Sequence, residues 1–336
     1  EFIYLVFLGM ASSLSLPPFN YLIINFLTFS LFFIFLVKKN IYKKNRFPFF
    51  YGWLFGFGYF ITNLYWISIS LTFDQNFKFL IPLSIIIIPA FLAIFYGLIS
   101  YFFMILKPKK IVSSFLIFSL IFGVLEFVRG TILTGFPWNL IAFSFSNHLE
   151  ILSITAIIGT YGFNLFCITL FTSPAIVILK NTKKNISVCI FLFITFLFFY
   201  IQGSFYKKRF NELEKNTYNH KIRVISSNIN LDRFYSNVDP VSVIEDLIKI
   251  SNPTAKEKII FVWPEGILPA ISQEELIEYH WLFNDHFNEN HLLVIGINSQ
   301  SVNNNSKDYF NSFSVYDNEL NLLNSYNKIN LVPFGE

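Results

Sequence analysis

The chain has 336 residues, of which 54% are hydrophobic, 20% aromatic and only 14% charged, and its formal net charge is +4. Soluble globular chains are about 25% charged, so long stretches of this chain cannot be solvated and a membrane protein is indicated. The lysines occur in short clusters between apolar runs and form no continuous basic face, which argues against nucleic acid as a partner.

Residues 1–203 are predicted to form a transmembrane helical domain of about seven spans. A spanning helix needs about 20 apolar residues to cross the hydrocarbon core of a bilayer. The first candidate is short, and could instead be the apolar region of a signal peptide, although no basic leader precedes it. The candidate spans are residues 2–16, 21–37, 48–71, 79–106, 111–128, 150–179 and 185–203.

Basic residues between the spans predict the orientation. Cytoplasmic loops carry an excess of lysine and arginine, so with seven spans everything after residue 203 is expected on the outer side. Lys207, Lys208 and Arg209 argue mildly against this orientation, because they follow the last span on the supposed outer side. The three basic loops that support it are Lys38 to Arg46, Lys107 to Lys110 and Lys180 to Lys184.

Several residues within the spans have a predicted structural role. Gly52 and Gly56 are four residues apart, a spacing that allows close packing of helices. Glu126 and Arg129 are three apart and can pair on one helix face, as a structural pair at the outer interface or, alternatively, in contact with a phospholipid headgroup. The two cysteines, Cys167 and Cys189, lie in apolar runs without metal-ligand spacing, so no disulfide, zinc site or cofactor is expected.

The composition changes near residue 207, and residues 204–220 are predicted to be a linker. Residues 221–336 alternate between strand-like and helix-like blocks, as in a soluble α/β domain. Asp239-Pro240 is expected to open a helix with an apolar face, residues 274–290 to form a more polar helix, and Asp317-Asn318 to make a hairpin turn. The expected strands are residues 222–229, 259–263, 292–297, 310–316 and 320–326. The domain looks incomplete, because it stops directly after a strand-like segment.

The first motif with chemical content is FVWPEGILP, residues 261–269. A short apolar strand ends at Trp263-Pro264, so Glu265 is expected at the carboxyl end of that strand, where open α/β sheets bind their ligands. A carboxylate there can act as a general base. The alternative is an ordinary solvated loop glutamate after a strand.

The second motif is YNKINLVPFGE, residues 326–336. Lys328 follows a strand-like run, and a lysine at a sheet edge can stabilise a developing oxyanion. Glu336 follows Pro333 and Gly335 and could orient a partner from a tight turn. Alternatively, Lys328 is a surface lysine whose aliphatic stem lies along the protein surface, and Glu336 is a terminal carboxylate without a role.

Together these motifs resemble one family. WPEG, YNK and LVPFGE are similar to segments in the nitrilase-like domain of apolipoprotein N-acyltransferases. EFVRGTILTGFPWN (126–139) and GFGYFITNLYWIS (56–68) resemble the family's membrane part, and YFNSFSVYD (309–317) resembles a further motif of its soluble part. The resemblance runs along essentially the whole chain in the family's order. It implies a multi-span α-helical membrane domain followed by an α/β nitrilase-like domain, an α-β-β-α sandwich that is incomplete here.

The resemblance also implies an activity and its residues. Glu265 matches the family's general base, Lys328 its oxyanion-stabilising cation and Glu336 a further glutamate beside them. The family transfers a fatty acyl chain from a membrane phospholipid to the N-terminal cysteine amine of diacylated apolipoprotein, outside the bacterial inner membrane, through a cysteine thioester. That cysteine has no match in this chain, since it lies beyond the PFGE segment and neither Cys167 nor Cys189 can replace it. The polypeptide as it stands is therefore expected to be inactive.

Two other classes remain as alternatives. A membrane-anchored nitrilase-like amidase would share Glu265 and Lys328 but would not explain the GFPWN stretch or the number of spans. A transporter or scaffold with an accessory domain would predict inverted repeats, and the sequence has no clear internal repeat.

Overall fold

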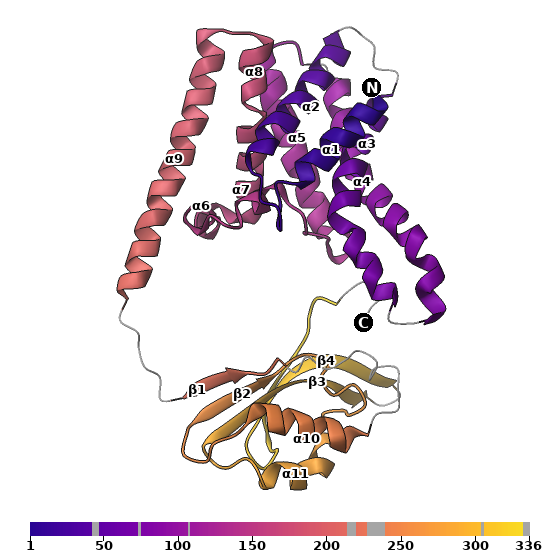
Figure 1. Ribbon diagram of the computed structural model, residues 1–336, viewed down its shortest axis with the longest axis vertical. Coiled ribbons are helices and arrows are strands. Elements are labelled where there is room, and N and C mark those ends of the chain that lie inside the picture. The colour runs from indigo at the N-terminus through magenta and orange to yellow at the C-terminus, as the bar shows by residue number, and fades with distance from the viewer. Residues whose placement is uncertain are drawn as a thin grey trace. The chain divides into compact units, whose positions relative to one another are not determined.

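The structure is a computed structural model that describes residues 1–41, 47–72, 75–106, 108–213, 220–226, 239–303 and 306–331. The chain divides into two compact units, Glu1–Leu213 and Glu214–Glu336. Figure 1 shows the first unit as a bundle of helices and the second as a sheet with helices packed on it. The prediction of a multi-span helical membrane domain followed by an α/β domain is confirmed.

Six helical segments of the described residues are long and apolar enough to cross a membrane, and α1, with 12 residues, is shorter. The last helix, α9, continues nine residues past the predicted end of the final span at residue 203. The helices are α1 (Phe2–Ser13), α2 (Ile23–Ile41), α3 (Pro48–Leu64), α4 (Ile81–Leu106), α5 (Ile111–Thr131), α6 (Leu149–Leu152), α7 (Thr155–Thr172), α8 (Pro174–Leu179) and α9 (Lys183–Glu212). Short 3₁₀ turns adjoin them: η1 (Tyr65–Thr72), η2 (Gln75–Leu80), η3 (Ile132–Thr134) and η4 (Ile141–Phe145).

Glycines and phenylalanines bring α2, α3 and α4 together. A Cβ atom on Gly52 would lie 1.9 Å from the carbonyl oxygen of Tyr96 in α4, and one on Gly56 would lie 2.6 Å from Cβ of Tyr96. The two backbones can approach this closely only because these positions carry no side chain. In the centre of the bundle, Phe32 stacks on Phe55 with ring centroids 4.3 Å apart. The predicted packing role of Gly52 and Gly56 is therefore confirmed.

The predicted span 150–179 is divided into α6, α7 and α8. Gly159 near the start of α7 has φ +73°, a conformation that glycine adopts without steric penalty, and it interrupts the helix there. Pro174 occupies the first turn of α8, where its missing N–H needs no partner. The apolar run predicted a helical segment over residues 150–179, and Gly159 and Pro174 determine where that segment is interrupted.

The second unit contains a five-stranded mixed sheet in the order β1-β2-β3-β4-β5. Strands β1, β2 and β3 are parallel, whereas β4 runs antiparallel to both β3 and β5. The helices α10 and α11 and the 3₁₀ turn η6 complete the unit, and Figure 1 shows α10 and α11 on one side of the sheet. The elements are β1 (Lys221–Val224), α10 (Pro240–Ser251), β2 (Ile259–Trp263), η6 (Leu276–Tyr279), α11 (His280–Asn284), β3 (His291–Asn303), β4 (Ser306–Tyr316) and β5 (Leu322–Asn327).

One face of the sheet is buried and the other is exposed. Trp263 of β2 is fully buried, packs against Phe283 of α11 and donates from Nε1 to Ser251 Oγ of α10 at 2.9 Å. On the opposite face, Val224 of β1 and Phe313 of β4 are exposed. Because neighbouring residues of a strand point to opposite faces, this unit has a one-sided core.

Helix α10 and the hairpin turn are confirmed as predicted. Asp239 accepts a hydrogen bond from Val241 N as the N-cap of α10, and Ile244, Leu247 and Ile248 are buried on its apolar face. Asp317 Oδ1 accepts hydrogen bonds from Glu319 N and Asn321 N, both at 2.9 Å, and closes the turn between β4 and β5. Local side-chain bonding of this kind is typical of turns.

The predicted helix over residues 274–290 is wrong. The segment instead contains η6 and the short helix α11, followed by a loop. Asn288 and Asn290 both donate from Nδ2 to the carbonyl oxygen of Ala255 at 3.1 Å. These bonds hold the loop against the segment that follows α10, and the chain then enters β3 instead of continuing as a helix.

Candidate functional site

Glu265 lies directly after β2, as predicted. Pro264 ends the strand, and Gly266 follows with φ +65°, in the left-handed region that glycine adopts readily. Gly296 of the neighbouring strand β3 approaches closely, since a Cβ atom there would lie 2.6 Å from Cα of Glu265. The absence of a side chain at residue 296 therefore allows the Glu265 backbone to lie against β3.

Lys328 lies directly after β5 and reaches Glu265. Its backbone N–H donates to the carbonyl oxygen of Asn311 in β4 at 2.8 Å, which continues the pairing of the two strands by one residue. Its Nζ lies 3.3 Å from Oε1 of Glu265. The structure thus brings together two predicted site residues that are 63 positions apart in the sequence.

Asn311 is a third member of the cluster. Its Nδ2 donates a hydrogen bond to Oε1 of Glu265, the same oxygen that Lys328 approaches. Asn311 was not among the candidate site residues, although the motif at 309–317 contained it. Its role depends on strand register, which a single sequence does not reveal.

A polar ladder fixes the strand that carries Lys328. Ser312 of β4 bonds to Ser299 of β3 at 2.6 Å and donates to Oδ1 of Asn327 of β5 at 2.8 Å. Ser314 and Ser325 both donate to Oε1 of Gln273, at 2.6 and 3.2 Å. The bonds of Ser312 and Ser314 are buried or half-buried and that of Ser325 is exposed. Together they hold β5 against β4, and Lys328 is the next residue along the chain after Asn327.

The cluster is open to solvent on the exposed face of the sheet. The side chain of Glu265 is 61% exposed and that of Lys328 is 32% exposed. A carboxylate that can accept a proton, a fixed ammonium group and an amide donor therefore converge at one accessible point. This is the combination that acyl transfer needs beside a nucleophile, namely a general base and a cation for the oxyanion.

The other predicted site residue and the two cysteines lie elsewhere. Glu336 lies outside the described residues. Cys167 is buried in α7 and Cys189 is half-buried in α9, so both cysteines of the chain belong to the first unit. Neither of the two is in the unit that carries Glu265 and Lys328.

Comparison with known proteins identifies the family. Residues 8–173 match the family model described as the apolipoprotein N-acyltransferase N-terminal domain. The apolipoprotein N-acyltransferase of Rhizobium leguminosarum bv. trifolii is 28% identical over 98% of this chain, and that of Brucella melitensis is 26% identical over 98% of it. The chain belongs to the apolipoprotein N-acyltransferase family. It spans about 64% and 63%, respectively, of the length of these two relatives.

The relatives match both units of this family member. A third, the apolipoprotein N-acyltransferase of Rhodopseudomonas palustris, is 27% identical over 98% of the chain and 63% of its own length. Since the matches cover nearly the whole chain, they include the membrane helices and the sheet that carries Glu265, Asn311 and Lys328. The resemblance inferred from the motifs is thereby confirmed for the family.

The membrane unit of this acyltransferase homologue holds a fully buried ion pair. Glu126 and Arg129 of α5 are both fully buried, and Arg129 donates from Nε and Nη2 to the two carboxylate oxygens at 3.1 and 2.8 Å. Its Nη1 donates to the carbonyl oxygens of Phe136 and Trp138, at 2.7 and 3.0 Å. The pair therefore ties the segment after α5 to the helix, in line with the structural role expected for it.

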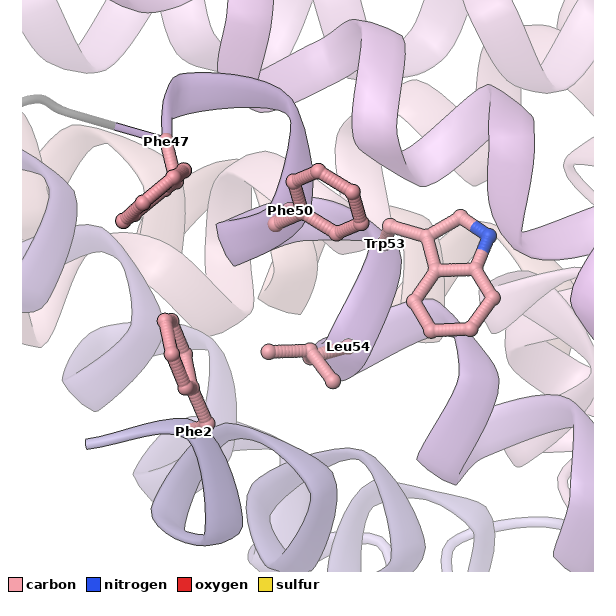
Figure 2. Close-up of a pocket in the computed structure, with 5 residues that line it drawn as sticks. All are labelled: Phe2, Phe47, Phe50, Trp53 and Leu54. Carbon is pink, nitrogen blue, oxygen red and sulfur yellow. The ribbon is translucent and has the colours of Figure 1, made fainter.

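Two pockets of the membrane unit are lined almost entirely by apolar side chains. One of about 380 Å³ is lined by Phe2, Phe47, Phe50, Trp53 and Leu54, and Figure 2 shows only aromatic and aliphatic side chains around it. Trp53 donates from Nε1 to the carbonyl oxygen of Ala90, so its polar atom is engaged on α4. Another, of about 490 Å³, lies beside the stacked rings of Trp66 and Trp138. Ser70, which lines the second pocket, donates its hydroxyl to the carbonyl oxygen of Ile67 at 2.7 Å, so both pockets offer mainly apolar surface.

Proposed function

We propose that this chain forms the membrane domain and part of the catalytic domain of an enzyme that transfers a fatty acyl chain from a membrane phospholipid to diacylated apolipoprotein. The acceptor is the N-terminal cysteine amine of the lipoprotein. The observation that carries the proposal is the convergence of Glu265, Lys328 and Asn311 at one exposed point. Family membership supports the reaction class.

The proposed reaction has two steps. A cysteine thiol loses its proton to Glu265 and attacks the ester carbonyl of the phospholipid, while Lys328 stabilises the oxyanion. The ester bond breaks, a lysophospholipid leaves with a proton, and a thioester remains. The lipoprotein amine then attacks the thioester, so that an amide forms and the thiol is released.

In this proposal Asn311 positions Glu265. Its amide donates to Oε1, the oxygen that also faces Lys328, and thereby holds the carboxylate at the end of β2. A general base works only within hydrogen-bonding reach of the proton that it accepts. We place Glu336 in the same site as a further carboxylate, by its match to the family alone.

The membrane location of the substrates fits the two-unit organisation. Both the acyl donor and the diacylated acceptor are anchored in a bilayer, so a soluble catalytic unit joined to membrane helices can meet them at the surface. We propose the bacterial inner membrane as the location, with the second unit on its outer side. The basic clusters Lys38–Lys39, Lys109–Lys110 and Lys183–Lys184 support this orientation by the positive-inside rule.

A polypeptide of these 336 residues alone is proposed to be inactive. Its two cysteines are Cys167 and Cys189, both in membrane helices, and the thiol that the mechanism needs is neither of them. Loss of a nucleophile leaves only binding and electrostatic contributions to the rate.

The test uses the product of the complete reading frame to which this chain belongs. The purified enzyme is mixed with phosphatidylethanolamine and a diacylated lipopeptide, and mass spectrometry follows the added acyl chain. Glu265→Gln should lower the rate by about 10²- to 10⁴-fold, because it removes the general base. Glu257→Gln is the matched control, since Glu257 is also an exposed carboxylate paired with a lysine, Lys221. A Glu265→Gln enzyme with an unchanged rate would contradict the proposal.

An amidase is the alternative supported by the same cluster, because Glu265 and Lys328 would serve carbon–nitrogen hydrolysis equally well. The two activities differ in their substrate. Release of ammonia from small amides with no lipopeptide acylation would favour the amidase.

A further inference from the structure

The last membrane helix borders a groove on the bundle. Helix α9 lies at the edge of the first unit, with α6 beside it (Figure 1), and only 11% of its most apolar stretch is buried. A pocket of about 310 Å³ lies between them. Phe145, Ile151, Phe196, Leu197 and Tyr200 line it with apolar surface, and His148 lines it with a polar ring.

A cation lies beyond one end of this groove. Phe196, Tyr200, Gly203 and Lys207 follow one another at intervals of four, three and four residues, so they share one face of α9. The Nζ of Lys207 lies 2.6 Å from Oε1 of Glu150 in α6. This hydrogen bond lowers the pKa of Glu150 below its ordinary value, so both groups are charged at neutral pH.

The pair is supported by a close backbone contact. A Cβ atom on Gly203 would lie 1.6 Å from the carbonyl oxygen of Glu150, so α6 and α9 touch through their backbones there. Lys208 and Arg209 follow Lys207, and Lys208 pairs with Glu212 at 3.8 Å. At 100° per residue, Lys208 and Arg209 lie on other sides of α9 than Lys207, so Lys207 is the cation on the face that carries Phe196 and Tyr200.

We propose that the α6/α9 groove binds one anionic phospholipid of the surrounding bilayer. Part of an acyl chain lies along Phe145, Phe196 and Tyr200, and the headgroup phosphate lies at Lys207 and His148. An occupant that is apolar along its length and anionic at one end complements a groove that is apolar and ends in a cation. This site does not depend on the proposed acyl transfer, and it assigns no role in catalysis to the bound lipid.

The volume of the groove favours a lipid chain over a helix. One turn of an α-helix with its side chains occupies roughly 400 Å³, from its 5.4 Å pitch and its diameter of about 10 Å. The groove holds about 310 Å³, which is too little for one helical turn but enough for part of a flexible acyl chain.

The experiment measures lipid retention by the purified chain in detergent. Native mass spectrometry follows the first bound molecule of phosphatidylglycerol, which is anionic, against phosphatidylethanolamine, which is zwitterionic. Lys207→Met should weaken phosphatidylglycerol retention about fivefold, the effect of one lysine near a membrane surface. Arg209→Met is the matched control: it lies roughly 200° around the helix from Lys207 and should leave retention unchanged.

Glu150→Gln separates lipid binding from a purely structural clamp. It removes the negative charge that competes with the phosphate for Lys207, so it should strengthen phosphatidylglycerol retention. If the pair only held α6 to α9, Lys207→Met and Glu150→Gln would weaken retention together. That result would overturn the proposal.

Filling the groove gives a second, independent measurement. Leu197→Trp places a larger ring in the groove and should abolish retention of the first phosphatidylglycerol. Ile194→Trp is the control, since Ile194 is an exposed aliphatic residue on the same helix that does not line the groove. Unchanged retention by Leu197→Trp, equal retention of the two lipids by the unmodified chain, or a dimer that Leu197→Trp dissociates would each refute the proposal.

Discussion

The two units of this molecule each contain a carboxylate–cation pair, and the two pairs differ in almost every physical respect. Glu126 and Arg129 lie three residues apart on one helix of the membrane unit and are fully buried. Glu265 and Lys328 lie 63 residues apart at the ends of two strands, with side chains 61% and 32% exposed. A carboxylate–cation pair is thus enclosed in the first unit and accessible in the second.

The difference shows how burial separates a structural ion pair from a reactive one. Arg129 also donates to the carbonyl oxygens of Phe136 and Trp138, and its guanidinium lies 5.3 Å from the ring of Phe60. A charge so enclosed cannot meet a substrate, and removal of its partner leaves an uncompensated ion in apolar surroundings. The exposed pair adds little stability but remains available for chemistry.

The largest expected effect is on the buried pair. Arg129→Met should destabilise the membrane unit by about 3–5 kcal/mol, because Glu126 is left buried without a partner. The measurement heats the protein in detergent and follows, by size-exclusion chromatography, the temperature at which the monodisperse peak is lost. The double variant Glu126→Leu/Arg129→Met should recover part of the loss, since no charge is then buried. A single variant as stable as the unmodified chain would show that water reaches the pair.

The exposed pair should respond in the opposite way. Lys328→Met should lower acyl transfer by the complete gene product about 10²- to 10³-fold, as expected for loss of an oxyanion-stabilising group. The stability of the second unit should change by no more than about 0.5 kcal/mol, because the side chain is partly exposed. Lys221→Met is the control, since Lys221 is also exposed and paired but lies at the start of β1. Equal losses of rate in Lys328→Met and Lys221→Met would show that Lys328 has no specific role in acyl transfer.

A third prediction concerns the backbone beside Glu265. Gly296→Ala should destabilise the second unit by about 1–3 kcal/mol, because the new methyl group meets backbone atoms of Glu265 that cannot move freely. Pulse proteolysis in urea measures the change. Gly162→Ala in α7 is the matched control, since a Cβ atom there lies 3.5 Å from its nearest neighbour. A neutral Gly296→Ala variant would mean that β2 and β3 can separate at the site without penalty.

The smallest expected effect, at or below pH 10, is a pH dependence of the stability of the second unit that arises from Tyr316 on the buried face of the sheet. Burial raises the pKa of Tyr316 to about 12, above the value of about 10 in an unfolded chain. The unfolded state therefore loses this proton first, so the stabilisation is complete below pH 10 and declines as the pH rises from 10 to 12. At pH 10 the decline is roughly 0.4 kcal/mol.

Tyr316→Phe removes the titrating group and should flatten this part of the profile. The urea midpoint of the second unit is measured by pulse proteolysis at pH 8, 9, 10 and 11 for Tyr316→Phe and for the unmodified chain. Identical profiles for the two proteins would show that the Tyr316 hydroxyl is solvated in the folded state.

Much of the membrane unit could be predicted because its evidence is local. Long apolar runs, basic loops and the spacing of Gly52 and Gly56 each act within one or two helices. The second unit was predictable where turn chemistry is local, as at Asp239 and Asp317. It was not predictable over residues 274–290, where Asn288 and Asn290 bond to Ala255 from a distant part of the chain.

The sequence by itself determined the membrane class, the order of the two units, the family resemblance and the positions of Glu265 and Lys328 at strand ends. Only the tertiary structure decided that these two residues meet, that Asn311 joins them, and that Gly296 makes room for Glu265. The reason is that composition and periodicity act between near neighbours, whereas these contacts arise from the register of strands far apart in the chain. The burial that separates the two ion pairs is likewise a property of the packed molecule.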